Sequence, residues 1–297
     1  MPIISRFAPS PTGHLHLGHA YAALFAWRAA RDAGGRFLLR IEDIDRQRCR
    51  PAFERDLLED LGWLGLDWQQ PVRRQSEHFA DYRAALARLQ ELGVVYPCFC
   101  SRKDIALAGG APHGDDQDGP PYPGRCRELP AAEAAARIAE GRPHASRLDV
   151  AKALALTGPL LWHDQAAGPQ PARPERLGDV VLARRDTPTS YHLSVTVDDA
   201  LQDVTLVTRG TDLFAATHIH RLLQALLGLP TPDYHHHPLL TNAEGQRLAK
   251  RDGAQAIRAL RAAGASAAAV RALAGFGDDG GVSAPAFPPI ASAGQSA

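Results

Sequence analysis

Two apolar runs near the start of the chain predict buried strands with a helix between them. Residues 3–7 and residues 36–43 are short and mostly apolar, which is typical of buried strands. From residue 18 to about residue 31 the apolar positions instead recur every three or four residues, and Gly34 follows them, as at a helix end. Strand, helix and strand in this order are typical of a parallel sheet.

The rest of the chain continues as a mixed α/β pattern. A helix is predicted to begin at Pro51, and another carries Phe79 to Leu89 and ends at Gly93. Shorter alternating stretches at residues 180–183 and 204–208 predict further strands, and two alanine-rich helices follow residue 254. The Gly-, Pro- and Asp-rich residues 109–123 predict a flexible surface loop, because almost none of them is apolar.

These patterns predict one catalytic body interrupted by an insertion. We expect residues 1–95 to form its first half, residues 96–190 the insertion, and residues 191–275 its second half. Residues 276–297 read as a disordered tail. There is no internal repeat.

Composition excludes several classes of protein. The 297 residues carry 33 basic and 33 acidic side chains, so the zero net charge argues against a broad polyanion-binding surface. Four cysteines in a chain of this length do not indicate a disulfide framework, and no apolar run reaches membrane length. We therefore expect a cytoplasmic protein. Lysine occurs only at Lys103, Lys152 and Lys250, so a lysine within a motif is less easily a coincidence.

The first strand leads into "RFAPSPTGHLHLGHA", where turn residues and histidines precede a helix. The entry of such a helix binds phosphate, because its free N–H groups and the positive end of its dipole point there. Gly18 would allow a nucleotide to approach the backbone. His16 and His19 lie on one face of the helix and can donate hydrogen bonds to charge that develops at phosphorus.

These residues resemble the class I aminoacyl-tRNA synthetases. "HLGH" at residues 16–19 is similar to the HIGH signature of that family, and the longer segment is similar to its glutamyl subgroup. "GQRLAKR" at residues 245–251 resembles the KMSKS loop, with Lys250 at its second lysine. Arg247 and Ala249 depart from that loop, and the second change removes a hydroxyl. "RIEDIDRQR" and "RGTDL" also resemble the glutamyl subgroup.

The resemblance implies a Rossmann-type α/β catalytic domain with a zinc-containing insertion and short C-terminal helices. It further implies that ATP, together with Mg²⁺, and glutamate react to give glutamyl-adenylate. His16, Gly18, His19 and Lys250 would bind ATP, and the two histidines and the lysine would be catalytic. The residues expected to bind glutamate are Arg6, Phe7, Ala8, Pro9, Ser10, Glu42, Tyr191 and Arg209.

Within this set the resemblance assigns one role to each charged group of glutamate. Arg6 and Tyr191 would hold the side-chain carboxylate, Arg209 the other carboxylate, and Glu42 the ammonium. Arginine suits a carboxylate because its planar fork donates two parallel hydrogen bonds.

A second group of residues predicts a structural metal. Cys98 and Cys100 point to the same side of an extended segment, and "YPGRC" adds Tyr122 and Cys126. The resemblance implies one zinc ion held by these three thiolates and the phenolate, which is a complete tetrahedral set. The long insertion between the two halves offers His113 as a rival ligand. The alternative is three thiols without a metal.

Two other clusters are given no metal. Three consecutive histidines at residues 235–237 cannot all face one point, so "YHHHP" is interpreted as a strand and turn leading to the Lys250 loop. Asp43 and Asp45 are interpreted as structural residues of the turn after Glu42.

The remaining question concerns the acceptor. A glutamyl-tRNA synthetase continues into a helical anticodon-binding domain, whereas only short helices are expected here after Lys250. This favours the branch of the family that transfers glutamate to queuosine in the anticodon of tRNA(Asp), and a monomer. Three alternatives are a fragment of a discriminating glutamyl-tRNA synthetase acting at the 3′ end, a non-catalytic RNA-binding paralogue, and a small-molecule ligase that uses aminoacyl-adenylate chemistry.

Overall fold

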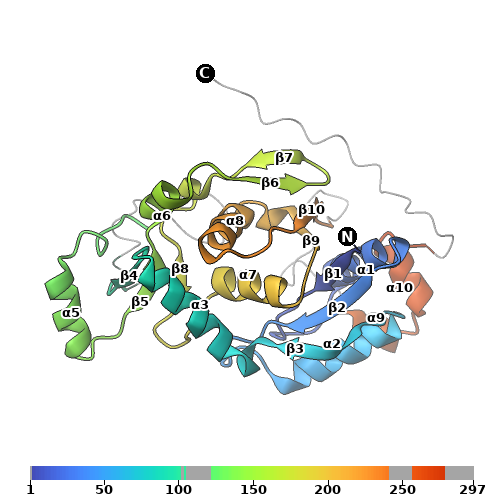
Figure 1. Cartoon of the computed structure of the whole chain (residues 1–297). Coiled ribbons are helices and arrows are strands. Elements are labelled where there is room, and N and C mark those ends of the chain that lie inside the picture. Colours follow the sequence, from blue (N-terminus) through green and yellow to red (C-terminus); the bar gives the residue numbers. More distant parts are fainter. Residues whose placement is uncertain (1, 102–103, 105–121, 241–255, 278–297) are drawn as a thin grey trace.

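The computed structural model describes residues 2–101, 104, 122–240 and 256–277 (Figure 1). The predicted flexible loop, apart from Tyr122 and Pro123, and the predicted tail from residue 278 onward lie outside these ranges. None of the helices in the described part of the chain combines the length and the apolar content that crossing a bilayer requires.

The first part of the chain forms the predicted parallel βαβ unit. Strand β2 lies between β1 and β3, and all three run in parallel. Helix α1 ends where predicted, and Pro51 occupies the first turn of α2, where its missing N–H is not needed. The elements are β1 (Ile4–Phe7), α1 (Leu17–Asp32), β2 (Arg36–Ile41), α2 (Pro51–Trp63), β3 (Gln69–Arg74) and α3 (Phe79–Glu91).

Strand β3 was not predicted from the sequence. Its residues, "QQPVRR", are all exposed or partly exposed and show no apolar alternation. Among the described strands β3 pairs with β2 alone, so it is an edge strand, where a proline such as Pro71 can be accommodated. Neighbours in space, and not periodicity, make this segment a strand.

The middle of the chain contributes an antiparallel sheet and a hairpin. The antiparallel sheet has the order β4–β5–β8, and the β6–β7 hairpin pairs through β6 with β10 of the second half. The elements are β4 (Val95–Cys98), α5 (Ala131–Ala139), β5 (Ala145–Leu148), α6 (Val150–Thr157), β6 (Leu161–Asp164), β7 (Gly168–Pro171) and β8 (Val181–Ala183).

The second half contributes β9 and β10 to a separate sheet of order β7–β6–β10–β9, which lies beside the sheet of the first half. Strand β9 pairs in parallel with β10, and a hydrogen bond of 3.0 Å from the Thr205 N–H to the Ile4 carbonyl joins β9 to β1. Both alanine-rich helices are present, so that prediction is confirmed. The elements are α7 (Tyr191–Leu201), β9 (Leu206–Gly210), α8 (Ala216–Leu227), β10 (Asp233–His237), α9 (Ile257–Ala262) and α10 (Ala267–Leu273).

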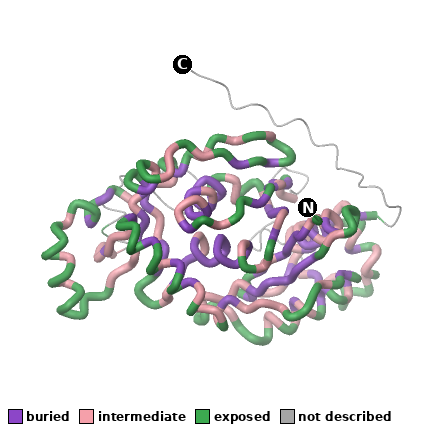
Figure 2. The backbone as a smooth tube through the Cα atoms, viewed as in Figure 1, coloured by how far each residue is buried: buried purple, intermediate pink, exposed green. Residues whose placement is uncertain are grey.

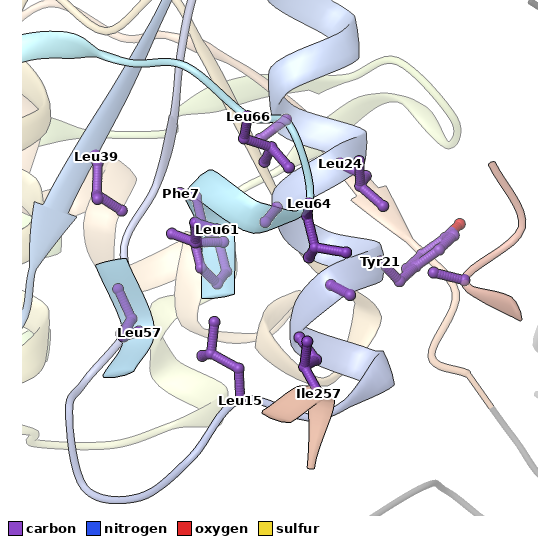
Figure 3. Packing of buried hydrophobic residues seen from close by; sticks show 14 of the residues in the cluster. Phe7, Leu15, Tyr21, Leu24, Leu39, Leu57, Leu61, Leu64, Leu66 and Ile257 are labelled. Atoms are coloured by element: carbon purple, nitrogen blue, oxygen red, sulfur yellow. The ribbon is translucent and has the colours of Figure 1, made fainter. Parts of the chain in front are cut away.

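The two largest apolar clusters pack helices against these sheets. One cluster packs α1 and α2 against β1 and β2, and Figure 3 shows Leu57 and Leu61 of α2 in this cluster with Leu24 of α1. A second cluster packs α3, α6, α7 and α8 together. Figure 2 shows α7 and α8 as the buried helices in the middle of the molecule, whereas α5 has no buried residue.

One buried carboxyl in this core is not balanced by a partner. Asp60 of α2 is 3% exposed, and its Oδ2 atom has no hydrogen-bond partner among the described residues. Burial raises the pKa of Asp60 to about 6, and the nearby Arg258 offsets this only in part. The ionised form therefore costs folding free energy at neutral pH.

We expect Asp60→Asn to raise the free energy of unfolding by about 1–3 kcal/mol at neutral pH. The pKa in the folded state lies above that in the unfolded state, so the cost is fully present above about pH 6 and disappears as pH falls toward about 4. Chemical denaturation over this pH range measures it, with Asp32→Asn on the surface as the matched control. A loss of stability at every pH would contradict the prediction.

Candidate active site

The paired histidines form the cap of helix α1. The Gly18 N–H donates to His16 Nδ1 at 3.1 Å, and the His16 N–H donates to His19 Nδ1 at 3.2 Å. The two ring centroids lie 3.8 Å apart. Because each Nδ1 accepts a hydrogen bond, a neutral ring carries its proton on Nε2. Each neutral imidazole therefore has its N–H donor on Nε2, the ring nitrogen that takes no part in the cap.

The lack of a side chain at Gly18 makes room for the histidine cap, in addition to the room it would leave for a nucleotide. A Cβ added at Gly18 would lie 3.0 Å from His16 Cε1, closer than side chains normally approach. The absence of a side chain thus lets the His16 ring accept the Gly18 N–H. The sequence predicted only the approach of a ligand, and the ring contact is a second reason for glycine here.

The chain beyond the downstream signature returns to the start of α1. Lys250, Arg247 and Ala249 lie outside the described residues. The described chain resumes at Ala256, which forms an antiparallel bridge with His16, and the Ile257 N–H donates to the Leu15 carbonyl at 2.9 Å. Figure 3 shows Ile257 beside Leu15. The chain that follows the KMSKS-like segment is therefore attached to the start of the HIGH-like one.

A small cavity opens at the carboxyl ends of β1 and β2. Its volume is about 110 Å³, and Ser10, Glu42 and Tyr191 line it together with residues of the turn after Glu42. Ligands bind at this edge of an open parallel sheet. The structure thus brings three of the predicted glutamate-binding residues to one cavity.

The other predicted residues of the first strand lie behind or beside this cavity. The Phe7 side chain packs into the apolar core with α2, as Figure 3 shows. The Pro9 carbonyl accepts the Glu42 N–H at 3.0 Å, which ties the ends of β1 and β2 together. Ala8, between them, is partly buried.

A pair of buried carboxylates that the sequence analysis missed organises the floor of the site. Asp199 of α7 accepts hydrogen bonds from Arg6 Nε at 2.9 Å, Arg6 Nη2 at 3.2 Å and Arg40 Nη1 at 2.7 Å. Burial alone would raise the pKa of Asp199, but these two guanidiniums outweigh it and hold the pKa below its usual range. Two adjacent acids in "SVTVDDAL", a segment without any other charged residue, were the signal in the sequence.

Asp198, the other member of the pair, binds residues of β3, of the turn that follows it and of α3. It accepts from Arg73 Nε at 2.7 Å, Gln75 Nε2 at 2.8 Å and the Tyr82 hydroxyl at 2.9 Å. The pair therefore fixes residues from β1, β2, β3 and α3.

Glu42 is held less tightly than Asp199. Its Oε1 atom accepts from Arg40 Nη2 at 3.2 Å. Burial raises the pKa of Glu42 in spite of the opposing charges of Arg40 and Arg6. A cation that entered the cavity would therefore stabilise the ionised form of Glu42.

Arg209 differs from the other buried arginines of the site. It is 6% exposed and donates to the Tyr191 hydroxyl at 3.2 Å and to three further uncharged groups. Among the described residues, no carboxylate forms an ion pair with it. Arg6 is instead committed to Asp199, so the structure groups Tyr191 with Arg209 and not with Arg6.

The three predicted cysteine ligands meet beside β4. The Sγ atoms of Cys98, Cys100 and Cys126 lie within 4.8 Å of one another, and Cys100 Sγ lies 3.5 Å from both Cys126 Sγ and the Tyr122 hydroxyl. Tetrahedral zinc with Zn–S bonds of about 2.3 Å requires sulfur atoms about 3.8 Å apart, so these donors fit that ion. The rival His113 lies outside the described residues.

Comparison with known proteins identifies the family. Residues 2–277 match the family model described as "tRNA synthetases class I (E and Q), catalytic domain". The chain belongs to this family. The prediction drawn from "HLGH" and "GQRLAKR" is therefore confirmed.

Several relatives of this synthetase family can be compared over most of the chain. A protein of Rhodobacter capsulatus named Glutamyl-Q tRNA(Asp) synthetase is 52% identical over 92% of this chain and 100% of its own length. One of the same name from Symbiobacterium thermophilum is 47% identical over 89% and 83%. Glutamate–tRNA ligase 2 of Acidithiobacillus ferrooxidans is 46% identical over 91% of this chain and 57% of its own length.

Solved synthetase structures show the same fold. The glutamate-tRNA synthetase of Elizabethkingia anophelis superposes with a TM-score of 0.73 at 28% identity, and the match covers 85% of this chain and 53% of that one. A glutamate tRNA ligase from Elizabethkingia meningosepticum, in complex with its amino acid, gives a TM-score of 0.71. The predicted α/β class I synthetase fold is confirmed.

The remaining sequence interpretations concern structural residues of the synthetase body. Asp43 accepts from the Ser76 N–H at 2.8 Å and Asp45 accepts from Arg48 Nε at 2.7 Å, as expected of turn residues. The histidine run lies in β10, as predicted, so its side chains alternate. His236 contacts Asp164 and Arg209, whereas the His237 ring contacts Tyr21 at a centroid distance of 4.9 Å.

Proposed function

We propose that this synthetase activates glutamate with ATP and transfers it to queuosine in the anticodon of tRNA(Asp). The observation that carries the proposal is the 52% identity to a protein named Glutamyl-Q tRNA(Asp) synthetase, over that protein's whole length. ATP, with Mg²⁺, and glutamate would react in the cytoplasm, without tRNA, to give glutamyl-adenylate and pyrophosphate. Glutamate would then pass from the adenylate to the queuosine base.

The geometry of the α1 entry supports the activation step. His16 and His19 have their Nε2 donors beside the helix N-terminus, where they would stabilise the α-phosphate as charge develops on it. Gly18 would leave room for ATP at this cap. Lys250 would hold the departing pyrophosphate.

The cavity supports glutamate as the amino acid. Glutamate brings two carboxylates and an ammonium. Glu42 would bind the ammonium, and Arg209 with Tyr191 would bind a carboxylate, because a buried guanidinium without an acidic partner requires an anion. Arg6, Ser10 and the backbone of residues 7–9 would complete the pocket.

A second acceptor is supported by one observation. A relative named Glutamate–tRNA ligase 2 is 46% identical over 91% of this chain. Transfer to the 3′ end of a tRNA is therefore the competing function.

We also propose that one zinc ion is held by Cys98, Cys100, Tyr122 and Cys126. The fit of the three sulfur positions to a tetrahedral ion supports it. The zinc ion would have a structural role, because it would cross-link the end of β4 to the segment around Cys126.

Activation is tested by glutamate-dependent exchange of pyrophosphate into ATP in the absence of tRNA. We expect exchange in the unmodified protein and a loss of about 10²–10³-fold in kcat for His19→Ala, because one donor to the developing charge is removed. His163→Ala, at an exposed histidine, is the control. Exchange that needs tRNA, or that survives His19→Ala in a folded protein, would contradict the assignment.

The acceptor is tested with an anticodon stem-loop of tRNA(Asp) that ends in a 3′-phosphate and so has no terminal diol. We expect labelled glutamate on the stem-loop that carries queuosine and none on the one that carries guanosine, because unstacked loop bases can enter a pocket. Full-length tRNA without queuosine is the control for the competing function. Labelling of that tRNA at its 3′ end alone would decide for a 3′-end synthetase.

The metal is tested by elemental analysis of protein purified without added zinc. We expect about one zinc per chain, lost in Cys100→Ser together with several degrees of thermal stability, because a structural metal contributes folding free energy. Cys49→Ser, outside the cluster, should keep the metal. A fully folded and active protein without zinc would show that the three cysteines are thiols that bind no metal.

A further inference from the structure

The contacts of Arg209 define the protonation of the side chains around it. Arg209 Nε donates to His236 Nε2 at 3.0 Å, so a neutral His236 carries its proton on Nδ1. That proton points to Asp164 Oδ2 at 2.6 Å. His236 is thus an acceptor for the guanidinium on one ring nitrogen and a donor to the carboxylate on the other.

The second histidine is oriented in the opposite sense. Arg209 Nη1 approaches His220 Nδ1 at 3.2 Å, and because a guanidinium can only donate, Nδ1 is the acceptor. The His220 proton therefore lies on Nε2 and points to His192 Nδ1, also at 3.2 Å. Arg209 thus contacts Nε2 of His236 but Nδ1 of His220.

Both histidines stay neutral in this setting. Burial lowers the pKa of His236 to about 4, and burial together with the charge of Arg209 lowers the pKa of His220 well below its usual value. Thr217 Oγ1 accepts a further bond from Nη2 at 2.5 Å. Four of the five N–H groups of Arg209 are therefore bound by uncharged acceptors, and no carboxylate of the described residues forms an ion pair with it.

This arrangement contrasts with the neighbouring arginines. Arg6 and Arg40 share the carboxylate of Asp199, and Arg40 also pairs with Glu42, so carboxylates of the protein balance their charges. Uncharged acceptors can hold a guanidinium in place equally well, but they do not neutralise its positive charge. An arginine that is meant to receive an anionic ligand needs acceptors of the second kind.

We infer that His220 and His236 are positioning residues that orient Arg209 and Tyr191 toward a carboxylate of the substrate. Nη1 of Arg209 binds both His220 and the Tyr191 hydroxyl, and Tyr191 lines the cavity. Because the hydroxyl oxygen accepts from Arg209, its own proton is available to a ligand oxygen. The inference rests on the proposed binding of glutamate in this cavity.

The opposite orientation of the two rings gives a test that a merely structural role would fail. The amide of asparagine occupies the place of Nδ1 of histidine, and that of glutamine the place of Nε2. At position 236, glutamine keeps an acceptor for Arg209, whereas asparagine keeps only a donor for Asp164. At position 220, asparagine keeps the acceptor, whereas glutamine keeps only the contact with His192.

The experiment compares His236→Gln with His236→Asn, and His220→Asn with His220→Gln, by glutamate-dependent pyrophosphate exchange. We expect the KM for glutamate of His236→Asn to exceed that of His236→Gln by about 10-fold, and that of His220→Gln to exceed that of His220→Asn similarly, since a hydrogen bond to a charged group is at stake. The KM for ATP should differ little within each pair. His163→Asn and His163→Gln, at an exposed histidine, are the matched control and should be equal.

Equal values within both pairs, or the same amide favoured at both positions, would overturn the inference. If one variant at a position does not fold, as judged by its thermal transition, the pair at the other position decides. Arg209→Lys separates this outcome from failure of the proposed function. An unchanged KM for glutamate in Arg209→Lys would mean that the cavity does not bind glutamate through Arg209, whereas a raised KM without the crossed pattern would leave glutamate binding intact and reject only the histidines.

Discussion

The buried carboxylates of Asp198 and Asp199 are the interaction on which the rest of the site depends. They lie on α7, yet their partners come from three strands and a helix that are 116 to 193 residues distant in the sequence. Without Asp199, Arg6 would have no carboxylate partner among the described residues, and Arg40 would lose one of its ion pairs. Without Asp198, Arg73 would lose one of its ion pairs as well. Removing one partner of a buried pair costs about 3–5 kcal/mol. The two halves of the catalytic domain are therefore joined by charge as well as by apolar packing.

This charge pairing also separates structural arginines from the one that is available to a ligand. Arg6 and Arg40 use the carboxylate of Asp199 and sit beneath the cavity, whereas Arg209 is surrounded by a hydroxyl, a phenol and two imidazoles. A buried cation of this second kind is unfavourable until an anion arrives. The ion pairs of Arg6 and Arg40 stabilise the fold and thereby offset the free-energy cost of burying Arg209 nearby.

The sequence predicted the parts of this structure that depend on local pattern. Apolar periodicity identified β1, α1 and β2, and the HIGH-like segment identified the histidine cap, because each is defined by neighbours in the chain. It missed β3, whose pairing with β2 is not written in its polar residues. It also missed Asp199 and the histidines around Arg209, because their partners are distant in sequence and only the fold brings them together.

The cysteine cluster and the cavity are connected through two adjacent residues. Arg184 follows β8 and lines the cavity, and Arg185 donates to the carbonyls of Phe99 at 2.7 Å and Cys100 at 2.6 Å. Strand β5 pairs with Cys98 through Ala145 and with Ala183 through Ser146, so the two sites share one end of the same sheet. One residue therefore contacts the cysteine segment while its neighbour in the chain forms part of the cavity wall. The zinc ion proposed at the cluster would hold the segment that Arg185 contacts, one residue away from the cavity wall.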